Sequence, residues 1–304
     1  MRSDPELSVV LPVFNEDATL PELHRRLLAV LEGLGLPFEV IYVDDGSSDG
    51  SAELLRERAA ADGRVILLVL SRNFGHQIAL TAGLDHARGD AVVLMDSDLQ
   101  DPPELIPTLV SRWKEGLEVV YAQRRARPGE SLFKRVTAYL FYRWLRAVAI
   151  VDIPADTGDF RLLSRRAADA LRSLPERGRF MRGLVAWVGF RQGKVLYDRP
   201  SRKAGESKYR LAHMFRLAMA GAFAFSGGFP ISLLGAAGGL VTAGSLLAMA
   251  LGAPTWTAGL FFLGGVQLLG LWVLGQYLST VAEEVRGRPL YVIRDEMNVH
   301  PAAK

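Results

Sequence analysis

The sequence predicts an α/β fold in which a mostly parallel sheet carries helices on both faces. Two observations over residues 1–125 support this prediction: short apolar runs alternate with longer helical stretches, and the runs are apolar almost throughout. Strands of this kind are typical of a parallel sheet that is buried on both faces and connected by crossover helices. No GxGxxG or Walker A sequence occurs, so neither a dinucleotide fingerprint nor a P-loop is expected.

Five strands and four helices are expected in this part of the chain. The strands, in order, are Leu7–Val13, Phe38–Val43, Val65–Leu70, Ala91–Met95 and Glu118–Tyr121. The helices between them are Thr19–Leu34, Gly50–Ala61, His76–Ala87 and Pro103–Glu115. Open sheets of this class bind their ligands at the carboxyl ends of the strands. A functional site is therefore expected in the segments that follow the strands.

Polar residues cluster directly after three of these strands, at 12–16, 44–49 and 96–101. In the third cluster, Asp96 and Asp98 project to the same side of an extended segment because strand side chains alternate. With Gln100 they form an all-oxygen set suited to Mg²⁺ or Mn²⁺. A lone Asp-x-Asp is also typical of a solvated turn, but its place at the end of an apolar strand favours the metal site.

The second cluster contains the adjacent carboxylates Asp44 and Asp45. Both suit hydrogen bonds to a nucleoside base or to a ribose. The alternative is a helix N-cap, a role for which Ser47, Ser48 or Asp49 is equally suited.

Composition and charge narrow the class of protein further. The chain has no cysteine, which excludes disulfides, thiolate metal sites and a cysteine nucleophile. Residues 1–111 carry 8 basic and 19 acidic side chains, a net of −11, whereas residues 112–216 carry 24 and 10, a net of +14. An acidic part suits a metal cation and a basic part suits phosphate. Nucleic acid is not expected as a partner, because no nucleic-acid motif occurs.

The 66 residues from Leu217 to Ala282 contain no Asp, Glu, Lys or Arg. Two apolar spans, 231–251 and 256–277, are each long enough to cross a bilayer and predict a two-helix transmembrane hairpin. Basic residues flank both outer ends, so the positive-inside rule places the large domain in the cytoplasm and the chain in the plasma membrane. The alternative is a pair of helices buried in a soluble core.

Several motifs, taken in order, resemble those of the family 2 glycosyltransferases. They are residues 11–16 (LPVFNE), 43–49 (VDDGSSD), 96–104 (DSDLQDPPE), 156–164 (DTGDFRLLS) and 202–209 (RKAGESKY). More narrowly, the set is similar to the polyisoprenyl-phosphate glycosyltransferases, such as dolichol-phosphate mannose synthase and the undecaprenyl-phosphate glucosyltransferases. The resemblance implies a nucleotide-sugar-binding α/β domain of the GT-A type.

The resemblance also implies roles for individual residues. Donor-binding positions are Pro12, Asn15, Glu16, Asp44, Asp45, Asp96 and Ser97, and metal ligands are Asp96, Asp98 and Gln100. The residues expected at the acceptor or donor phosphates are Arg124, Arg135, Arg202 and Lys203. Asp159 matches the catalytic base of the family, and the alternative is a carboxylate that orients Arg161 or Arg202.

The expected reaction is metal-dependent, inverting transfer of one sugar from a nucleotide donor to a polyisoprenyl phosphate at the cytoplasmic membrane face. The expected sugar is glucose, the expected donor is UDP-glucose and the expected acceptor is undecaprenyl phosphate. A processive polysaccharide synthase is the first alternative, but its Gln-x-x-Arg-Trp motif is incomplete, since Leu109 replaces the glutamine before Arg112-Trp113. A non-catalytic membrane scaffold or sensor on the same fold is the second.

The expected organisation has four parts. Residues 1–210 form a cytoplasmic catalytic domain, 211–230 a juxtamembrane helical segment, 231–280 the two transmembrane helices and 281–304 a cytoplasmic tail. The glycine-rich spans suit close packing of helices within one chain or between the subunits of a homo-oligomer.

Overall fold

The computed structural model describes residues 4–125, 157–197, 238–241, 244 and 256–299. These residues belong to two compact units. The first contains the eight strands of the described chain and the helices that cover them, and the second contains the long helix α10 (Trp256–Val285).

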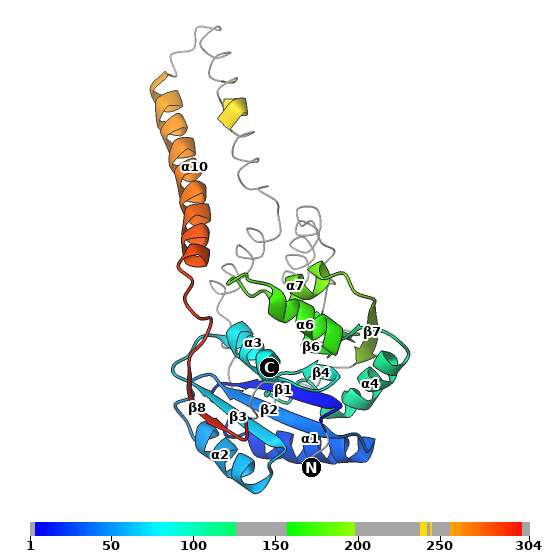
Figure 1. The fold of residues 1–304 in the computed structure, drawn as a ribbon. Coiled ribbons are helices and arrows are strands. Elements are labelled where there is room, and N and C mark those ends of the chain that lie inside the picture. Colours follow the sequence, from blue (N-terminus) through cyan, green and yellow to red (C-terminus); the bar gives the residue numbers. More distant parts are fainter. Residues whose placement is uncertain (1–3, 126–156, 198–237, 242–243, 245–255, 300–304) are drawn as a thin grey trace. The chain divides into compact units, whose positions relative to one another are not determined.

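One mixed sheet forms the centre of the first unit (Figure 1). Its strands are β1 (Leu7–Val13), β2 (Phe38–Asp44), β3 (Val65–Leu70), β4 (Ala91–Leu94), β5 (Val119–Arg124), β6 (Thr157–Ser164), β7 (Gln192–Tyr197) and β8 (Ile293–Met297). Their spatial order is β7-β5-β6-β4-β1-β2-β3-β8. The four central strands β4, β1, β2 and β3 are parallel, whereas β6 and β8 run antiparallel to their neighbours β4 and β3. The carboxyl ends of the central strands therefore form one edge of the sheet.

Helices cover both faces of this sheet (Figure 1). They are α1 (Leu20–Leu34), α2 (Ser51–Ala61), α3 (His76–His86), the 3₁₀ turn η1 (Pro103–Leu105), α4 (Ile106–Lys114), α6 (Arg165–Ser173) and α7 (Met181–Trp187). α1, α2 and α4 pack on one face, and α3 and α6 lie on the other. α3 lies especially close to the sheet, because a Cβ on Gly83 would stand 2.2 Å from Cγ1 of Val10. This glycine brings α3, and with it the residues at its first turn, directly against β1.

The local sequence explains where α1 begins and ends. Proline stands in its first turn, where no backbone N–H is needed, and Gly35 ends it with φ 65°, a conformation that glycine adopts without strain. Leu20, Leu23, Leu27 and Leu31 recur every three or four residues and are fully buried against the strands. Burial of each leucine contributes about 1.5–3 kcal/mol before the entropy cost is counted.

The α/β class and the order of the first five strands and four helices are confirmed, with small shifts at their ends. β2 includes Asp44, β4 ends at Leu94 and β5 extends to Arg124. β6, β7 and β8 were not predicted. β8 in particular has a polar sequence, yet it is the edge strand that pairs antiparallel with β3. Asn298, which follows it, donates to the carbonyls of Ala59 and Val65.

The prediction of two transmembrane helices, and of a multi-pass plasma-membrane protein with a cytoplasmic domain, is corrected by the structure. Within the described residues, no helix combines the length and the apolar character needed to cross a bilayer. α10 has 30 residues, but glycines recur along it and Gln267 and Gln276 interrupt its apolar sequence, which lowers its mean hydropathy. The juxtamembrane segment 211–230 and most of the span 231–251 lie outside the described residues.

Candidate functional site

The loops after β1 and β2 are joined to each other at the carboxyl edge of the sheet. The Asn15 backbone N–H donates to Ser47 Oγ at 3.0 Å, and Asn15 Oδ1 accepts from the Ser48 N–H at 2.8 Å. Asn15 adopts φ 55°, a left-handed conformation that asparagine tolerates better than most residues. Glu16 N–H donates to Ser51 Oγ at 2.9 Å. Two of the three predicted donor-binding residues of the first cluster, Asn15 and Glu16, therefore connect it to the second cluster and to the start of α2.

Asp44 and Asp45 are both buried at this edge. Asp45 accepts hydrogen bonds from the backbone N–H groups of Phe74 at 2.7 Å and Gly75 at 2.9 Å, and so fixes the loop that leads into α3. Asp44 accepts longer bonds, 3.3 and 3.4 Å, from the Ser47 N–H. Burial raises the pKa of both carboxyl groups above its ordinary value, although these hydrogen bonds oppose the shift.

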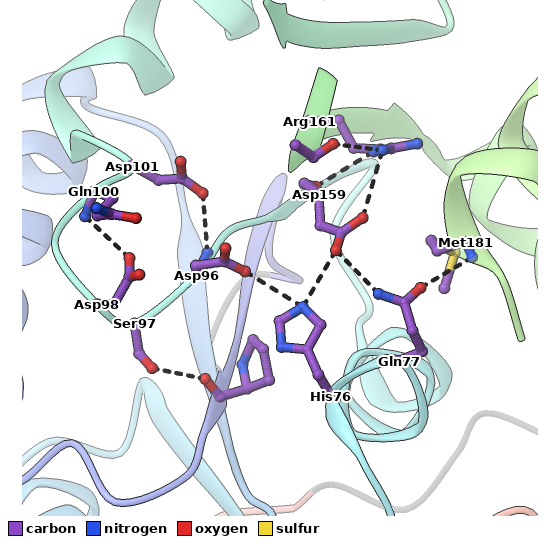
Figure 2. Close-up of polar contacts among 12 residues, drawn as sticks. His76, Gln77, Asp96, Ser97, Asp98, Gln100, Asp101, Asp159, Arg161 and Met181 are labelled. Atoms are coloured by element: carbon purple, nitrogen blue, oxygen red, sulfur yellow. Dashed lines mark hydrogen bonds and ion pairs between the residues drawn. The ribbon is translucent and has the colours of Figure 1, made fainter. Parts of the chain in front are cut away.

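The loop after β4 carries the Asp-x-Asp sequence (Figure 2). Ser97 Oγ donates to the Pro12 carbonyl at 2.8 Å, which connects this loop to the end of β1. Asp98 Oδ1 accepts from the Gln100 N–H at 3.1 Å. Figure 2 shows the Asp98 and Gln100 side chains on one side of the loop, while the Asp96 carboxylate points the other way, toward His76. The expectation that Asp96 and Asp98 project to the same side was wrong, because the segment is a loop and not an extended strand.

Asp101 is buried and fixes the Asp-x-Asp loop through both oxygens of its carboxylate. One of its carboxylate oxygens accepts from the Asp96 N–H at 3.3 Å, and the other accepts from the Tyr197 hydroxyl at 3.1 Å. Tyr197 is the last residue of β7. The orientation of Asp96 is thereby connected to the outer strands of the sheet.

Asp159, near the start of β6, is the centre of a cluster of charges. Its side chain is only 6% exposed. Arg182 Nε, on α7, donates to Asp159 Oδ1 at 3.1 Å, and Arg161 Nη2 lies 3.7 Å from the same oxygen. His76 Nε2, at the start of α3, lies 3.3 Å from Asp159 Oδ2 and 3.4 Å from Asp96 Oδ1. The imidazole therefore bridges the two carboxylates (Figure 2).

These contacts shift the proton affinities of the cluster in opposite directions. Burial lowers the pKa of His76, but the charge of Asp96 and the hydrogen bond and charge of Asp159 outweigh it and raise the pKa to about 9. Burial raises the pKa of Asp159, but Arg182, His76 and Arg161 together hold it well below its ordinary range. Asp159 is thus an ionised carboxylate with low proton affinity at neutral pH.

A metal ion has suitable ligands at this edge. Oxygen or nitrogen atoms of His76, Asp96 and Asp159 all lie within 4.8 Å of one another. Asp96 and Asp98, two residues apart on one loop, offer the carboxylate oxygens that Mg²⁺ and Mn²⁺ prefer. Because such hard cations prefer oxygen ligands, the donor chemistry fits an ion held by the carboxylates better than one held by His76.

Of the four predicted phosphate-binding residues, the structure describes one. Arg124 ends β5, and its Nη2 lies 3.4 Å from the point where a Cβ on Gly158 would stand, beside Asp159. Its buried Nε has no hydrogen-bond partner among the described residues. Arg135, Arg202 and Lys203 lie outside the described residues.

Five residues of this site were not given a role from the sequence: His76, Gln77, Asp101, Arg182 and Tyr197. The predicted topology could have pointed to His76 and Gln77, because both begin the helix that follows β3 and every loop after a parallel strand opens at the carboxyl edge. Arg182 and Tyr197 had no such signal, because α7 and β7 were not predicted.

A doubly wound sheet with carboxylates after β2 and β4 and an arginine-bound carboxylate on β6 is typical of α/β enzymes, whose ligands bind at the carboxyl edge. The model of the family described as "Glycosyl transferase family 2" matches residues 8–172, and the chain belongs to this family. It is a glycosyltransferase, as the sequence predicted.

Curated relatives match along almost the whole chain. "Uncharacterized glycosyltransferase YkcC" of Bacillus subtilis is 43% identical over 97% of this chain and 95% of its own length. "SfII prophage-derived bactoprenol glucosyl transferase" of Shigella flexneri is 37% identical over 97% of this chain and 100% of its own. Among solved structures, a glucosyl-3-phosphoglycerate synthase from Mycobacterium tuberculosis covers 73% of this chain and 80% of its own with a TM-score of 0.49 and 22% identity, too distant to bear on activity.

Proposed function

We propose that this protein transfers one glucosyl group from UDP-glucose to undecaprenyl phosphate, with inversion at the anomeric carbon and with Mg²⁺ or Mn²⁺. The observation that carries the proposal is the arrangement of the carboxyl edge. The Asp96 and Asp98 loop stands beside the ends of β1 and β2, and Asp96 is bridged through His76 to Asp159. The relatives named as bactoprenol glucosyl transferases support the choice of sugar and acceptor.

The donor nucleotide is assigned to the ends of β1 and β2. Asp44 and Asp45 face the base or the ribose, and their burial keeps bulk water from competing for those hydrogen bonds. Asn15 and Glu16 hold the loop that carries these residues, through their contacts with Ser47, Ser48 and Ser51. Pro12 and Ser97, joined by a hydrogen bond, set the spacing between the proposed donor site and the Asp-x-Asp loop.

Asp96, Asp98 and Gln100 would hold the divalent cation. When bound, such a cation acts as a Lewis acid that stabilises negative charge on the departing diphosphate. The protein's part is to fix the ligands beforehand. The Asp96 N–H bond to Asp101 and the Gln100 N–H bond to Asp98 do this, because each fixes the loop backbone on one side.

The acceptor brings its own nucleophile. A phosphate monoester has a second pKa near 6 and is largely a dianion at neutral pH, so little is gained from a general base. Its oxygen forms a bond to the anomeric carbon while the bond from that carbon to the diphosphate breaks, which leaves UDP and a lipid-linked phosphodiester. Asp159, with its low proton affinity, suits the orienting role better than the role of a base. It holds Arg161 and Arg182 in place while the anions approach.

Two anions must meet in this site, and cationic side chains reduce their repulsion. Arg124 is the proposed phosphate contact within the described residues, since it lies beside Gly158 and Asp159. Arg135, Arg202 and Lys203 complete the proposed set. We also propose that residues 1–210 are the catalytic domain and that β8 completes its sheet; the pairing of β8 with β3 supports the second part.

A screen of radiolabelled nucleotide sugars with undecaprenyl phosphate tests the proposal. We expect one labelled glucose per lipid from UDP-glucose, extractable into organic solvent, and no transfer without a divalent cation. Transfer of another sugar with the same yield would overturn the choice of glucose. Water-soluble polymers as products would favour a processive synthase, and the absence of any transfer would favour a non-catalytic role.

A further inference from the structure

Gln77, the second residue of α3, connects two elements of the site through the two ends of its side-chain amide (Figure 2). Its Nε2 donates to Asp159 Oδ2 at 3.0 Å. Its Oε1 accepts from the backbone N–H of Met181, the first residue of α7, at 2.9 Å. Both bonds have ordinary lengths for well-formed hydrogen bonds.

The partners of Gln77 determine which way its amide faces. A carboxylate can only accept a hydrogen bond and a backbone N–H can only donate one, so the NH₂ group must face Asp159 and the oxygen must face Met181. The reversed orientation would set an oxygen against a carboxylate and an amide hydrogen against another hydrogen. No other orientation satisfies both partners, and the amide is therefore a rigid spacer between Asp159 and α7.

Arg182 closes these contacts into a ring. The residue after Met181 donates from Nε to Asp159 Oδ1 at 3.1 Å, while Gln77 donates to Oδ2 of the same carboxylate. Each oxygen of Asp159 thus receives one donor that is fixed to the first turn of α7, in addition to the nearby His76 and Arg161. Asp159 is 6% exposed but the Arg182 side chain is 32% exposed, so the ring joins a buried carboxylate to a guanidinium that reaches the surface of the site.

We propose that Gln77 is a positioning residue for the transfer reaction, which sets the orientation of the Asp159 carboxylate and, through α7, of Arg182. This inference rests on the proposed function, because it assumes that Asp159 and Arg182 act at the reacting phosphates. Misplacement of such groups by about 1 Å is enough to slow a reaction by about 100-fold. Gln77 itself contacts neither substrate.

A matched control comes from the other end of α7. Gln192, the first residue of β7, donates from Nε2 to the carbonyl of Val185 at 3.1 Å. Like Gln77, it is half-buried and holds the α7 backbone with its amide. Unlike the hydrogen bonds of Gln77, this bond to α7 does not involve Asp159. A comparison of Gln77→Leu with Gln192→Leu therefore separates the orientation of Asp159 from simple anchoring of α7.

The test measures glucosyl transfer from UDP-glucose to undecaprenyl phosphate by the full chain, with folding of each variant checked by circular dichroism. For Gln77→Leu we expect kcat to fall about 10- to 100-fold with the KM for UDP-glucose changed by less than about twofold. Gln192→Leu is expected to keep the kcat of the unaltered protein. Equal kcat values for the two variants, or a loss confined to KM, would overturn the inference.

A double variant with Asp159→Asn adds a second readout that a purely structural role would not change. If Gln77 acts through Asp159, the double variant is no slower than Asp159→Asn alone, because the group that it positions is already altered. Independent, multiplicative losses would contradict the inference. If the unaltered protein transfers no sugar under any donor, the proposed function fails instead, and this outcome is distinct from a failure of Gln77 alone.

Discussion

The carboxyl ends of the central strands form one edge of the sheet and their amino ends form the opposite, amino edge. Each edge contains a buried carboxylate, but the partners of the two carboxylates differ. Asp159 lies at the carboxyl edge, and Glu39 lies near the start of β2, at the opposite edge. Both side chains are at most 6% exposed. α3 connects the two edges: His76 and Gln77 begin it beside Asp159, and Arg88 follows its end beside Glu39.

Oε1 of Glu39 is held by a buried hydroxyl and a backbone N–H, while Oε2 lies 3.5 Å from Nε of Arg88, a side chain that is 36% exposed. This Oε1 accepts from Ser8 Oγ at 2.6 Å and from the Arg88 backbone N–H at 2.7 Å, and Ser8 Oγ in turn accepts from the Gly89 N–H at 2.7 Å. A side chain at Gly89 would not fit, since its Cβ would stand 2.5 Å from the Ser8 nitrogen. This network fixes the turn between α3 and β4.

Asp159 is held by side chains that reach the surface of the site. His76 is 33% exposed and Arg182 is 32% exposed. Both carboxylates therefore have a partly exposed cation as a partner, but among the described residues Asp159 has two, His76 and Arg182, and they lie where the parallel strands end and such sheets bind their ligands. Position at the carboxyl edge, rather than exposure of the partners alone, distinguishes Asp159 from Glu39. Substitution of Asp159 at the carboxyl edge is therefore expected to lower activity, and substitution of Glu39 at the amino edge to lower stability.

Removal of the divalent cation gives the largest expected effect. A Lewis acid at the diphosphate contributes several kcal/mol of transition-state stabilisation, so chelation should slow glucosyl transfer by about 1,000-fold or more. Addition of excess Mg²⁺ or Mn²⁺ should restore the rate. Initial rates measured before and after treatment with EDTA check this, and an unchanged rate would refute the metal assignment.

Asp159→Asn should lower kcat by about 100-fold, because Arg182 and His76 lose the charge that orients them. It should also destabilise the fold by about 3–5 kcal/mol, since Arg161 stays buried without a carboxylate. The kcat is therefore calculated per folded molecule, with the folded fraction taken from a urea titration. A kcat equal to that of the unaltered protein would remove Asp159 from the mechanism.

Glu39→Gln should leave kcat within about twofold and lower the free energy of unfolding by about 1–3 kcal/mol. The amide oxygen can keep the bonds from Ser8 Oγ and the Arg88 N–H, since both lie on Oε1. The NH₂ group then replaces Oε2 and faces Arg88 Nε, so the ion pair is lost and two donors meet. Urea unfolding followed by circular dichroism measures the loss. A variant that is as stable as the unaltered protein but transfers glucose more slowly would contradict the purely structural role of Glu39.

The smallest expected effect is a pH dependence of the free energy of unfolding, from Asp62 at the amino edge. A hydrogen bond from Arg64 lowers the pKa of Asp62 below its ordinary value of 3.8. A carboxyl group with a depressed pKa in the folded state stabilises the fold above the ordinary value, and this contribution is lost as the pH falls through the lower one. Asp62→Asn should therefore cost less than about 1 kcal/mol at neutral pH and nothing near pH 2. Equal costs at both pH values in urea titrations would contradict this origin.

The sequence was sufficient for the central sheet because its apolar runs are almost uninterrupted: β3 contains no polar residue and β1 contains only Ser8. It was insufficient for β6 and β8, where Asp159, Arg161 and Arg294 interrupt the apolar pattern and the long-range pairing with β4, β5 or β3 decides the structure. The Asp-x-Asp loop and Asp159 were identified by motif. The bridge of His76 between them was not, because no spacing along the chain relates residues 76, 96 and 159 that only the fold brings within contact.

One measurement tests the distinction between the two edges most directly: single-turnover glucosyl transfer by Asp96→Asn and by Glu39→Gln, each corrected for its folded fraction. Both changes replace a carboxylate by an amide of nearly the same shape. We predict that Asp96→Asn is slower by about 1,000-fold and Glu39→Gln by less than about twofold. Similar rates for the two variants would contradict the assignment of catalysis to the carboxyl edge.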